Sequence, residues 1–295
     1  MIELKDKTVV ISGGAEGIGL GVAQVLGRHG MNVVLADINE AQLAVAENTL
    51  QEQGAEVLTV SLDAADVEQW ENVAWQAIKR FGKIHMLVNN AGVGGTPGAV
   101  DATPEKDWRW VIDVNLMGVV SGARTIVPII KQHGEGGWLI NVASMAGFGG
   151  LPMAGPYSAT KAAVVAMSEC WHAELQADNI HVSVLCPGFV KTRINKSQRN
   201  KQAQYQVDND RRENSAKQGA LADQMQKVLD AGLPPEVVGE RVVEAIAAGE
   251  LYIFTHPNYR SAVQRRFTAI DDAFQRAAAS RLLASVTDEE IPGIG

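Results

Sequence analysis

The stretch Thr8-Val9-Val10-Ile11-Ser12-Gly13-Gly14-Ala15-Glu16-Gly17-Ile18-Gly19 decides the fold. Its opening β-branched residues are typical of a buried parallel strand. The glycines permit a tight turn, and Val22, Val25 and Leu26 continue as a helix that stops at Gly30. A strand, a glycine-rich turn and a helix in this order place backbone N–H groups against a pyrophosphate at the helix N-terminus. The stretch therefore predicts a dinucleotide-binding βαβ unit, although its G-x-x-x-G-x-G spacing differs from the commoner G-x-G-x-x-G.

An acidic residue after the next strand favours NAD as the dinucleotide. Asn32-Val33-Val34-Leu35-Ala36 is expected to be that strand, and Asp37 stands at its carboxyl end. A carboxylate at this position accepts hydrogen bonds from the adenosine ribose. The 2′-phosphate of NADP would meet Asp37 and Glu16 and find Ile38 instead of a cation. Like charges about 4 Å apart cost about 4 kcal/mol at an effective dielectric of about 20. The alternative is that Asp37 only caps the following helix.

Tyr157 and Lys161 in Gly155-Pro156-Tyr157-Ser158-Ala159-Thr160-Lys161 would share one face of a helix. An ammonium about 4 Å from a phenol favours the phenolate by about 4 kcal/mol, which corresponds to roughly 3 pKa units. This shift would bring Tyr157 into the range of a general acid or base. Taken alone, the pair also fits an ordinary surface contact, so the surrounding motifs decide its meaning.

Further motifs follow in a fixed order, and with them the chain resembles the short-chain dehydrogenase/reductase family over about residues 4–254. They are Asn89-Asn90-Ala91-Gly92, Asp113-Val114-Asn115-Leu116, Ser144 after Leu139-Ile140-Asn141-Val142-Ala143, and Pro187-Gly188-Phe189-Val190-Lys191-Thr192. Ser12 stands where the family usually has Thr, and it keeps the hydroxyl. The resemblance implies an α/β fold, namely a Rossmann-type doubly wound parallel sheet of about seven strands.

The same resemblance implies catalytic roles for Asn115, Ser144, Tyr157 and Lys161. Tyr157 would exchange a proton with the substrate oxygen, and Ser144 would hydrogen-bond that oxygen where charge develops. Lys161 would hold the nicotinamide ribose and favour the tyrosinate, and Asn115 would hold a water that links Lys161 to solvent. The simpler alternatives are that Ser144 ends a strand and Asn115 satisfies a helix backbone.

An NAD site is also implied by the resemblance, with Thr192 at the carboxamide and Asp63 at the adenine edge. Its expected residues are Ser12, Gly13, Gly17, Ile18, Gly19, Asp37, Asp63, Ala64, Asn90, Ala91, Gly92, Tyr157, Lys161, Pro187, Gly188, Val190 and Thr192.

Length and the alternation of short apolar runs with longer helical segments predict one doubly wound domain over residues 1–256 and a helical extension over 257–295. Expected helices include Glu40 to Gln53, Val67 to Phe81 and Pro235 to Ala248, each followed by glycine. The extension should form an amphipathic helix between Pro257 and Ser285, able to cover its own pocket or a partner's.

The polar stretch 193–233 follows the nicotinamide motif and is expected to be a helical substrate lid. Met145, Phe148, Met153 and Phe189 should line the same mouth, which favours a bulky, largely apolar substrate. The alternative is that they pack a subunit interface. The long lid and the extended C-terminus together resemble bacterial dehydrogenases that oxidise the Cα alcohol of lignin-derived aryl ethers.

The net charge of −8 argues against a nucleic-acid partner. The sequence contains no uninterrupted apolar run of membrane-spanning length, and the first residues lack a signal-peptide core, so no membrane partner is expected. Cys170 and Cys186 are the only cysteines, which fits a reducing cytoplasm. The histidines lack metal-ligand spacing, and a homodimer or homotetramer is expected.

Together these features predict an NAD-dependent alcohol dehydrogenase that acts on CH–OH donors and interconverts a secondary alcohol and a ketone. An aryl or benzylic alcohol is one such substrate. The alternatives are an NADPH-dependent ketoreductase and a non-catalytic NAD-sensing regulator.

Overall fold

The computed structural model describes residues 2–207 and 215–286, and the chain divides into two compact units. The first unit is Met1–Thr255 and the second is His256–Gly295. The division lies one residue before the boundary expected from the sequence. The first unit contains the sheet and the second contains the helix α9 (Arg260–Ala278), with short 3₁₀ turns at Pro257–Tyr259 and Arg281–Leu283.

The first unit is built on a seven-stranded sheet in the order β3-β2-β1-β4-β5-β6-β7. Every neighbouring pair is parallel. The strands are β1 (Thr8–Ser12), β2 (Asn32–Asp37), β3 (Val57–Ser61), β4 (Met86–Asn89), β5 (Gly137–Val142), β6 (Ile180–Cys186) and β7 (Tyr252–Phe254). The order reverses between β1 and β4, and open α/β sheets bind ligands at the carboxyl ends of strands around such a point. The doubly wound parallel sheet predicted from the sequence is confirmed.

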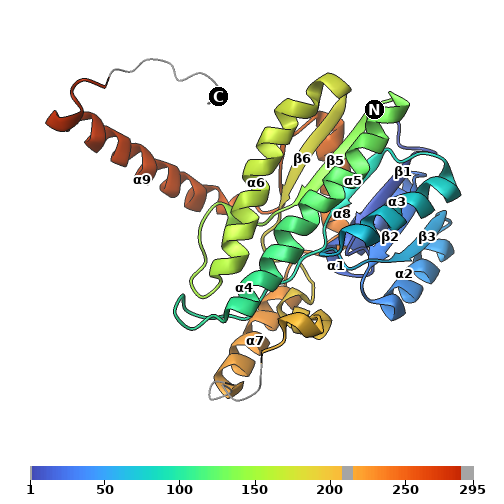
Figure 1. Cartoon of the computed structure of the whole chain (residues 1–295), viewed down its shortest axis with the longest axis horizontal. Helices are drawn as coiled ribbons and strands as arrows, with labels where there is room; N and C mark the ends of the chain where they lie inside the picture. The colour runs from blue at the N-terminus through green and yellow to red at the C-terminus, as the bar shows by residue number, and fades with distance from the viewer. Residues whose placement is uncertain (1, 208–214, 287–295) are drawn as a thin grey trace. The chain divides into compact units, whose positions relative to one another are not determined.

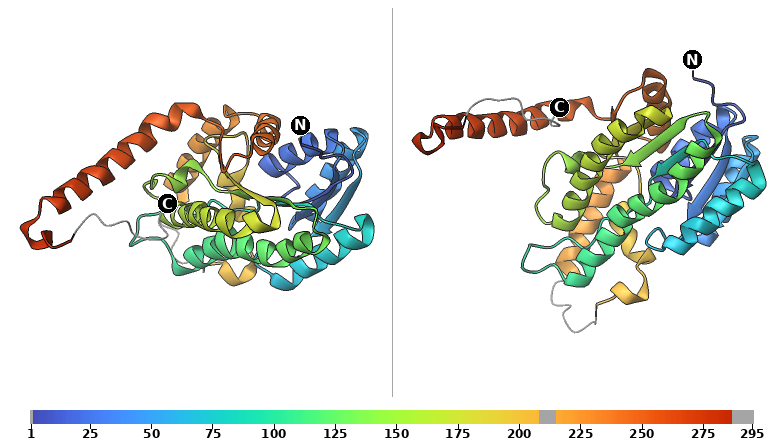
Figure 2. Two further views of the ribbon diagram at one scale, coloured as in Figure 1. Left: turned by 90° about the horizontal axis from the view of Figure 1, so that it is seen from above. Right: turned by 45° about the horizontal axis from the view of Figure 1, so that its top comes forward.

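Helices cover both faces of this sheet (Figures 1 and 2). One layer consists of α1 (Gly17–Arg28), α2 (Glu40–Glu52) and α8 (Pro235–Ala248), and the other of α3 (Val67–Phe81), α5 (Gly118–His133) and α6 (Gly155–Leu175). Successive strand side chains point to opposite faces. Val9 and Ile11 therefore join the core under α1 and α8, whereas Val10 joins the core under α3 and α5. Burial on both faces explains the uninterrupted apolar run in β1.

The helix ends follow local signals in the sequence. The side chain of Asp66 accepts hydrogen bonds from the N–H groups of Glu68 and Gln69 at the start of α3, and Gly82 ends the helix with a φ of 81°. Both α3 and α8 have the bounds predicted from the sequence, and α2 ends one residue earlier than expected. The glycines that follow these helices therefore located their C-terminal ends to within one residue.

A long helical run from Glu105 to His133 packs on one face of the sheet and consists of three consecutive parts. It begins as α4 (Glu105–Ile112), widens to a π-helix over Asp113–Met117, and continues as α5. By length and composition alone the run could cross a membrane, but 61% of its most apolar window is buried inside the fold. It packs beside α3 and α6 in the helical layer on one face of the sheet (Figure 1).

His85, just before β4, is the basis of a prediction about stability at acid pH. Its Nδ1 accepts a hydrogen bond from the Thr8 N–H (3.0 Å), and its Nε2 lies 3.2 Å from Glu135 Oε2. Burial lowers the pKa of His85, and the neighbouring Lys7 lowers it further, against the raising effect of Glu135. Because the unfolded pKa is about 6.5, the folded protein binds fewer protons. The stabilisation is therefore complete above about pH 6.5 and is lost as the pH falls toward the folded pKa.

We expect His85→Asn, which keeps an acceptor for the Thr8 N–H without a titrating ring, to flatten the fall in unfolding free energy between about pH 7 and about pH 5. Denaturant unfolding at several pH values measures this slope. His181→Asn, at an exposed position of β6, is the matched control and should keep the wild-type slope. An unchanged slope in the His85 variant would contradict the prediction.

Candidate active site

The glycine-rich turn joins β1 to α1 at the switch point of the sheet. Gly13 has a φ of +62°, and a Cβ there would lie 2.8 Å from the Ala91 Cα, so the turn tolerates only glycine at this position. The Ser12 hydroxyl oxygen accepts hydrogen bonds from the N–H groups of Asn90 and Ala91, each at 3.1 Å. The carboxyl ends of β1 and β4 are thereby held together around the turn.

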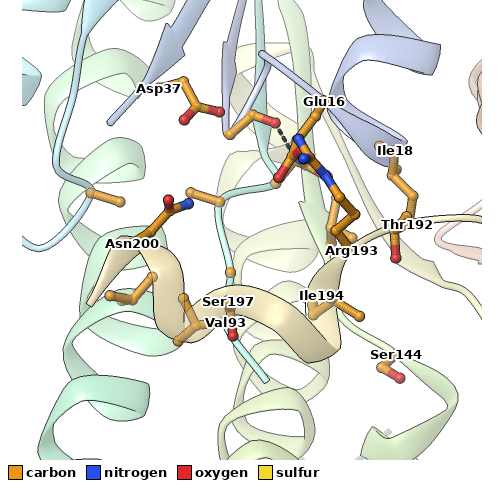
Figure 3. A pocket seen from close by; sticks show the side chains of 18 of the residues that line it. Glu16, Ile18, Asp37, Val93, Ser144, Thr192, Arg193, Ile194, Ser197 and Asn200 are labelled. Atoms are coloured by element: carbon orange, nitrogen blue, oxygen red, sulfur yellow. Dashed lines mark hydrogen bonds and ion pairs between the residues drawn. The ribbon is translucent and has the colours of Figure 1, made fainter. Parts of the chain in front are cut away.

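One cleft runs along this edge of the sheet, and its lining includes nearly every residue of the predicted cofactor site. Figure 3 shows part of this lining, including Ile18, Asp37 and Thr192. Among the predicted residues, the lining includes Gly13, Gly17, Ile18, Asp37, Asp63, Ala64, Asn90, Ala91, Gly92, Tyr157, Lys161, Pro187, Gly188, Val190 and Thr192. Ser12 and Gly19 are not in the lining. Ser12 holds the turn through its hydroxyl, which accepts a hydrogen bond from Asn90 N–H. Gly19 lies close to the Gly13 backbone, where a side chain would not fit. Because Gly17 and Ile18 at the start of α1 line the cleft, a phosphate bound there would meet the helix N-terminus.

Asp37 presents a nearly buried carboxylate to the cleft. One oxygen accepts a hydrogen bond from Ala15 N–H (3.1 Å) and the other from Asn39 N–H (3.0 Å). Burial raises the pKa of Asp37, and the backbone hydrogen bonds oppose this rise. The cap of α2 is Asn39, whose side chain accepts from Gln42 N–H at 3.1 Å. The alternative in which Asp37 serves only as a helix cap is therefore wrong.

Ser144, Tyr157 and Lys161 meet at the other end of the cleft. Ser144 Oγ accepts a hydrogen bond from Ala146 N–H (3.1 Å), which leaves its own proton free for the hydrogen bond with the Tyr157 phenol. Lys161 Nζ lies 5.7 Å from the centre of the Tyr157 ring and donates to the Val142 carbonyl at 2.7 Å. The helix α6 supplies both residues one turn apart, as the sequence spacing predicted.

The electrostatics of this group differ from the expectation drawn from the sequence. Burial raises the pKa of Tyr157, and the hydrogen bond from Ser144 opposes the rise. Burial also lowers the pKa of Lys161 to about 8. The expected lowering of the phenol pKa by a nearby ammonium is thus wrong, because burial of the phenol is the largest effect and the Lys161 Nζ donates to a backbone carbonyl. With its pKa raised above the usual range, Tyr157 is a protonated phenol at neutral pH.

Asn115 is fully buried behind the cleft and does not line it. It sits in the π-helix, a local distortion that is frequent at functional sites. Its side chain accepts from Val93 N–H (2.7 Å) and donates to the Val93 carbonyl (2.9 Å). A Cβ on Gly92 would lie 3.4 Å from Asn115 Oδ1 and 3.5 Å from Lys161 Nζ, so both polar groups face the same small space beside Gly92.

The segment after Thr192 brings two cations to the glycine-rich turn. Arg193 and Arg199 both form ion pairs with Glu16, and all three residues line the cleft. The expectation that a 2′-phosphate would find no cation here is therefore wrong. Arg193 and Glu16 are 177 positions apart in the sequence, so the residues next to Glu16 and Asp37 did not indicate that a cation would be close. Glu16 acts as the counter-ion of these arginines.

A sequence model described as short chain dehydrogenase matches residues 7–203. This chain belongs to the short-chain dehydrogenase family. A CLA biosynthesis dehydrogenase/reductase of Lactiplantibacillus plantarum is 33% identical, covering 92% of this chain and 95% of that protein. A C alpha-dehydrogenase of Sphingobium sp. is 31% identical over 92% of this chain and 88% of its own length. The crystal structure of a short-chain dehydrogenase/reductase from Burkholderia phymatum in complex with NAD is 36% identical, with a TM-score of 0.87, over 92% of this chain and 96% of that one.

The substrate residues expected from the sequence lie outside the lining of this cleft. Met145 and Phe148 pack on the small core formed by α6 and β6, and the Phe148 ring lies 5.4 Å from that of Phe254. Met153 and Phe189 are exposed. The cleft of this short-chain dehydrogenase instead takes its apolar wall from residues that the sequence did not single out, namely Val93, Trp110, Val114, Ile194 and Leu229.

Part of the expected lid borders the cleft. Residues Ile194–Asn200 and Ala203–Tyr205 form short 3₁₀ turns, and α7 (Ser215–Asp230) follows, while residues 208–214 lie outside the described part. Ser197 Oγ accepts from Gly94 N–H (3.0 Å), and Gln202 Nε2 donates to Asp63 Oδ2 (2.7 Å). No group of three or more His, Cys, Asp or Glu side chains in the described ranges is placed to hold a metal ion.

Lys201 anchors this segment to α4 by a nearly buried ion pair with Asp107, with side-chain exposures of 8% and 4%. Its Nζ also lies 5.1 Å above the ring centre of Trp110. Removing one partner of such a pair leaves an uncompensated buried charge. We expect Lys201→Met to lower the free energy of unfolding by about 3 kcal/mol.

Arg109→Met is the matched control for Lys201→Met. Arg109 pairs with Glu105 on the same helix, but both side chains are exposed, so its loss should cost less than about 1 kcal/mol. Denaturant unfolding compares the two variants. Equal effects would show that the Lys201 pair is not buried in solution.

Proposed function

We propose that this short-chain dehydrogenase is an NAD-dependent alcohol dehydrogenase that interconverts a secondary alcohol and a ketone. The observation that carries the proposal is the joint presence of Ser144, Tyr157 and Lys161 at one end of a cleft whose other end holds the Asp37 carboxylate. The relative from Burkholderia phymatum, which was crystallised with NAD, supports the choice of cofactor. When bound, the dinucleotide supplies the group that accepts or donates the hydride.

The residues of the chain handle binding and proton transfer. Asp37 is placed to accept hydrogen bonds from ribose hydroxyls, and its charge opposes a 2′-phosphate. Ser144 donates a hydrogen bond at the phenol and is placed to stabilise a substrate oxygen that gains charge. Tyr157 holds a proton on its phenol for a carbonyl oxygen, and in the opposite direction takes it from an alcohol. Lys161 and Asn115 face the space beside Gly92, through which a water could link the lysine to solvent.

For the substrate we propose a bulky, largely apolar secondary alcohol, of which a benzylic alcohol of the lignin aryl-ether type is one candidate. The apolar wall formed by Val93, Ile194 and Leu229 supports this class, as does the similarity to the C alpha-dehydrogenase of Sphingobium sp.. The segment 193–233 is proposed as its lid. The free cysteines Cys170 and Cys186 support a cytoplasmic location, and a homodimer or homotetramer is proposed.

A panel of aryl, alicyclic and steroidal secondary alcohols, assayed for NADH formation, tests the function. A benzylic alcohol should give the highest kcat/KM, and NADP should support little turnover. An NADPH-dependent ketoreductase would instead reduce the matching ketones faster with NADPH than with NADH. Tight NADH binding without turnover of any alcohol or ketone would favour a non-catalytic NAD sensor.

A further inference from the structure

The C-terminal helix α9 carries a stripe of large apolar side chains that is not buried. Phe267 is 53% exposed and Phe274 is 72% exposed, and no residue of α9 falls in the buried class. A helix of this length gains most of its stability from burying an apolar face. The stripe therefore calls for a partner surface.

The spacing of the stripe identifies the kind of surface. Val263, Phe267, Ile270, Phe274 and Ala277 alternate steps of four and three residues, which is the seam of a coiled coil. A helix that covers a globular core usually shows a wider apolar face. The face opposite the seam is polar, with charges at Arg265, Asp272 and Arg276. The pattern thus fits a second helix with a matching seam.

The charges beside the seam identify the partner and its direction. Arg266 immediately precedes Phe267, and Asp271 immediately follows Ile270. In a parallel pair of identical helices, these flanking positions face each other across the seam, so Arg266 of each helix meets Asp271 of the other. In an antiparallel pair, a flanking position on one side of the seam faces the same flanking position of the other helix. Arg266 would then meet Arg266 or Ala273 of the second helix. Only the parallel arrangement gives opposite charges on both sides.

We propose that α9 pairs in parallel with α9 of a second copy of this chain. A fully exposed phenylalanine presents roughly 200 Å². At exposures of 53% and 72%, the four phenylalanines of two paired seams can therefore remove roughly 500 Å² from water, about half of the 1,000 Å² expected of a specific interface, and Val263, Ile270 and Ala277 add to it. The other common use of an amphipathic helix is docking on an anionic membrane, and α9, with four arginines and two aspartates, has a net positive charge. Asp271 lies directly beside the stripe, however, where it would oppose an anionic surface and pairs with Arg266 only in the two-helix arrangement.

A cysteine cross-link in the full chain tests the pairing directly. In a parallel, in-register pair, each seam residue faces its own counterpart, so Ile270→Cys should form a disulfide-linked dimer under mild oxidation. The exposed native thiol is removed by Cys170→Ser in every variant. Thr268→Cys, on the polar face, is the matched control and should stay monomeric on a denaturing gel. Linkage of Ile270→Cys no greater than that of Thr268→Cys would overturn the proposal.

Charge reversal provides a second test, read by sedimentation velocity over a concentration series. Arg266→Asp should place like charges on both sides of the seam and weaken α9-dependent association at least about tenfold. Adding Asp271→Arg to this variant should restore the association, because opposite charges again face each other in a parallel pair. In an antiparallel pair the second substitution would bring no opposite charges together. Failure of this rescue, or association that Phe267→Ser and Phe274→Ser together leave unchanged, would contradict the pairing. Binding to phosphatidylserine vesicles that depends on these phenylalanines would assign the stripe to a membrane and likewise overturn it.

Discussion

Tyr157→Phe is expected to lower kcat by about 10²–10⁴-fold while NADH binding stays close to that of the wild type. The phenylalanine keeps the ring but loses the oxygen that exchanges a proton with the substrate. Most of the cleft lining that would contact a dinucleotide is untouched, so the loss should fall on the transition state and not on cofactor affinity. Steady-state kinetics and a fluorescence titration with NADH measure the two quantities separately.

Tyr252→Phe is the matched control for Tyr157→Phe. Tyr252 also loses a phenolic hydrogen bond, in this case to Glu169 at 2.6 Å, but it does not line the cleft. Its kcat should remain near that of the wild type. A Tyr157→Phe variant that retained more than about a tenth of wild-type kcat would show that Tyr157 is not the acid/base.

The second large effect concerns the choice between NAD and NADP. Asp37→Ala combined with Ile38→Arg is expected to move the NADP/NAD ratio of kcat/KM upward by about 10²–10³-fold, because about 4 kcal/mol of repulsion is removed and a phosphate-binding guanidinium is added. Ile38 is exposed and lines the cleft, so an arginine there has room to reach a bound phosphate.

The ion pairs of Glu16 add a separate arm to this experiment. Glu16→Gln should release Arg193 and Arg199 from their counter-ion, and it should raise NADP activity further when added to the Asp37 variant. Glu40→Ala removes an exposed carboxylate of the same charge at the start of α2, away from the cleft lining, and should leave the ratio unchanged. If the Asp37 variant also kept the wild-type NADP/NAD ratio of kcat/KM, Asp37 would not determine which adenosine ribose the cleft accepts.

The sequence determined the fold and most of the cofactor cleft because these depend on short-range patterns. The β-branched run of β1, the glycine turn and the Gly82 signal after α3 each act within one element or one turn. The i, i+4 spacing fixed Tyr157 and Lys161 on one helix in the same way. Parallel strands then bring their carboxyl ends to one edge, so motifs after different strands meet there without any knowledge of the intervening chain.

Only the tertiary structure decided which groups surround those motifs. The ion pairs of Glu16 with Arg193 and Arg199 and the bond from Gln202 to Asp63 join residues more than a hundred positions apart, through a polar segment without helical or strand periodicity. The pKa of Tyr157 likewise depends on how deeply the phenol is buried and on its hydrogen bond with Ser144. The periodicity and spacing of residues in the sequence encode a helix or strand and its faces. Contacts across the cleft depend instead on the path of the whole chain, and burial in the cleft sets the energy of each charged group.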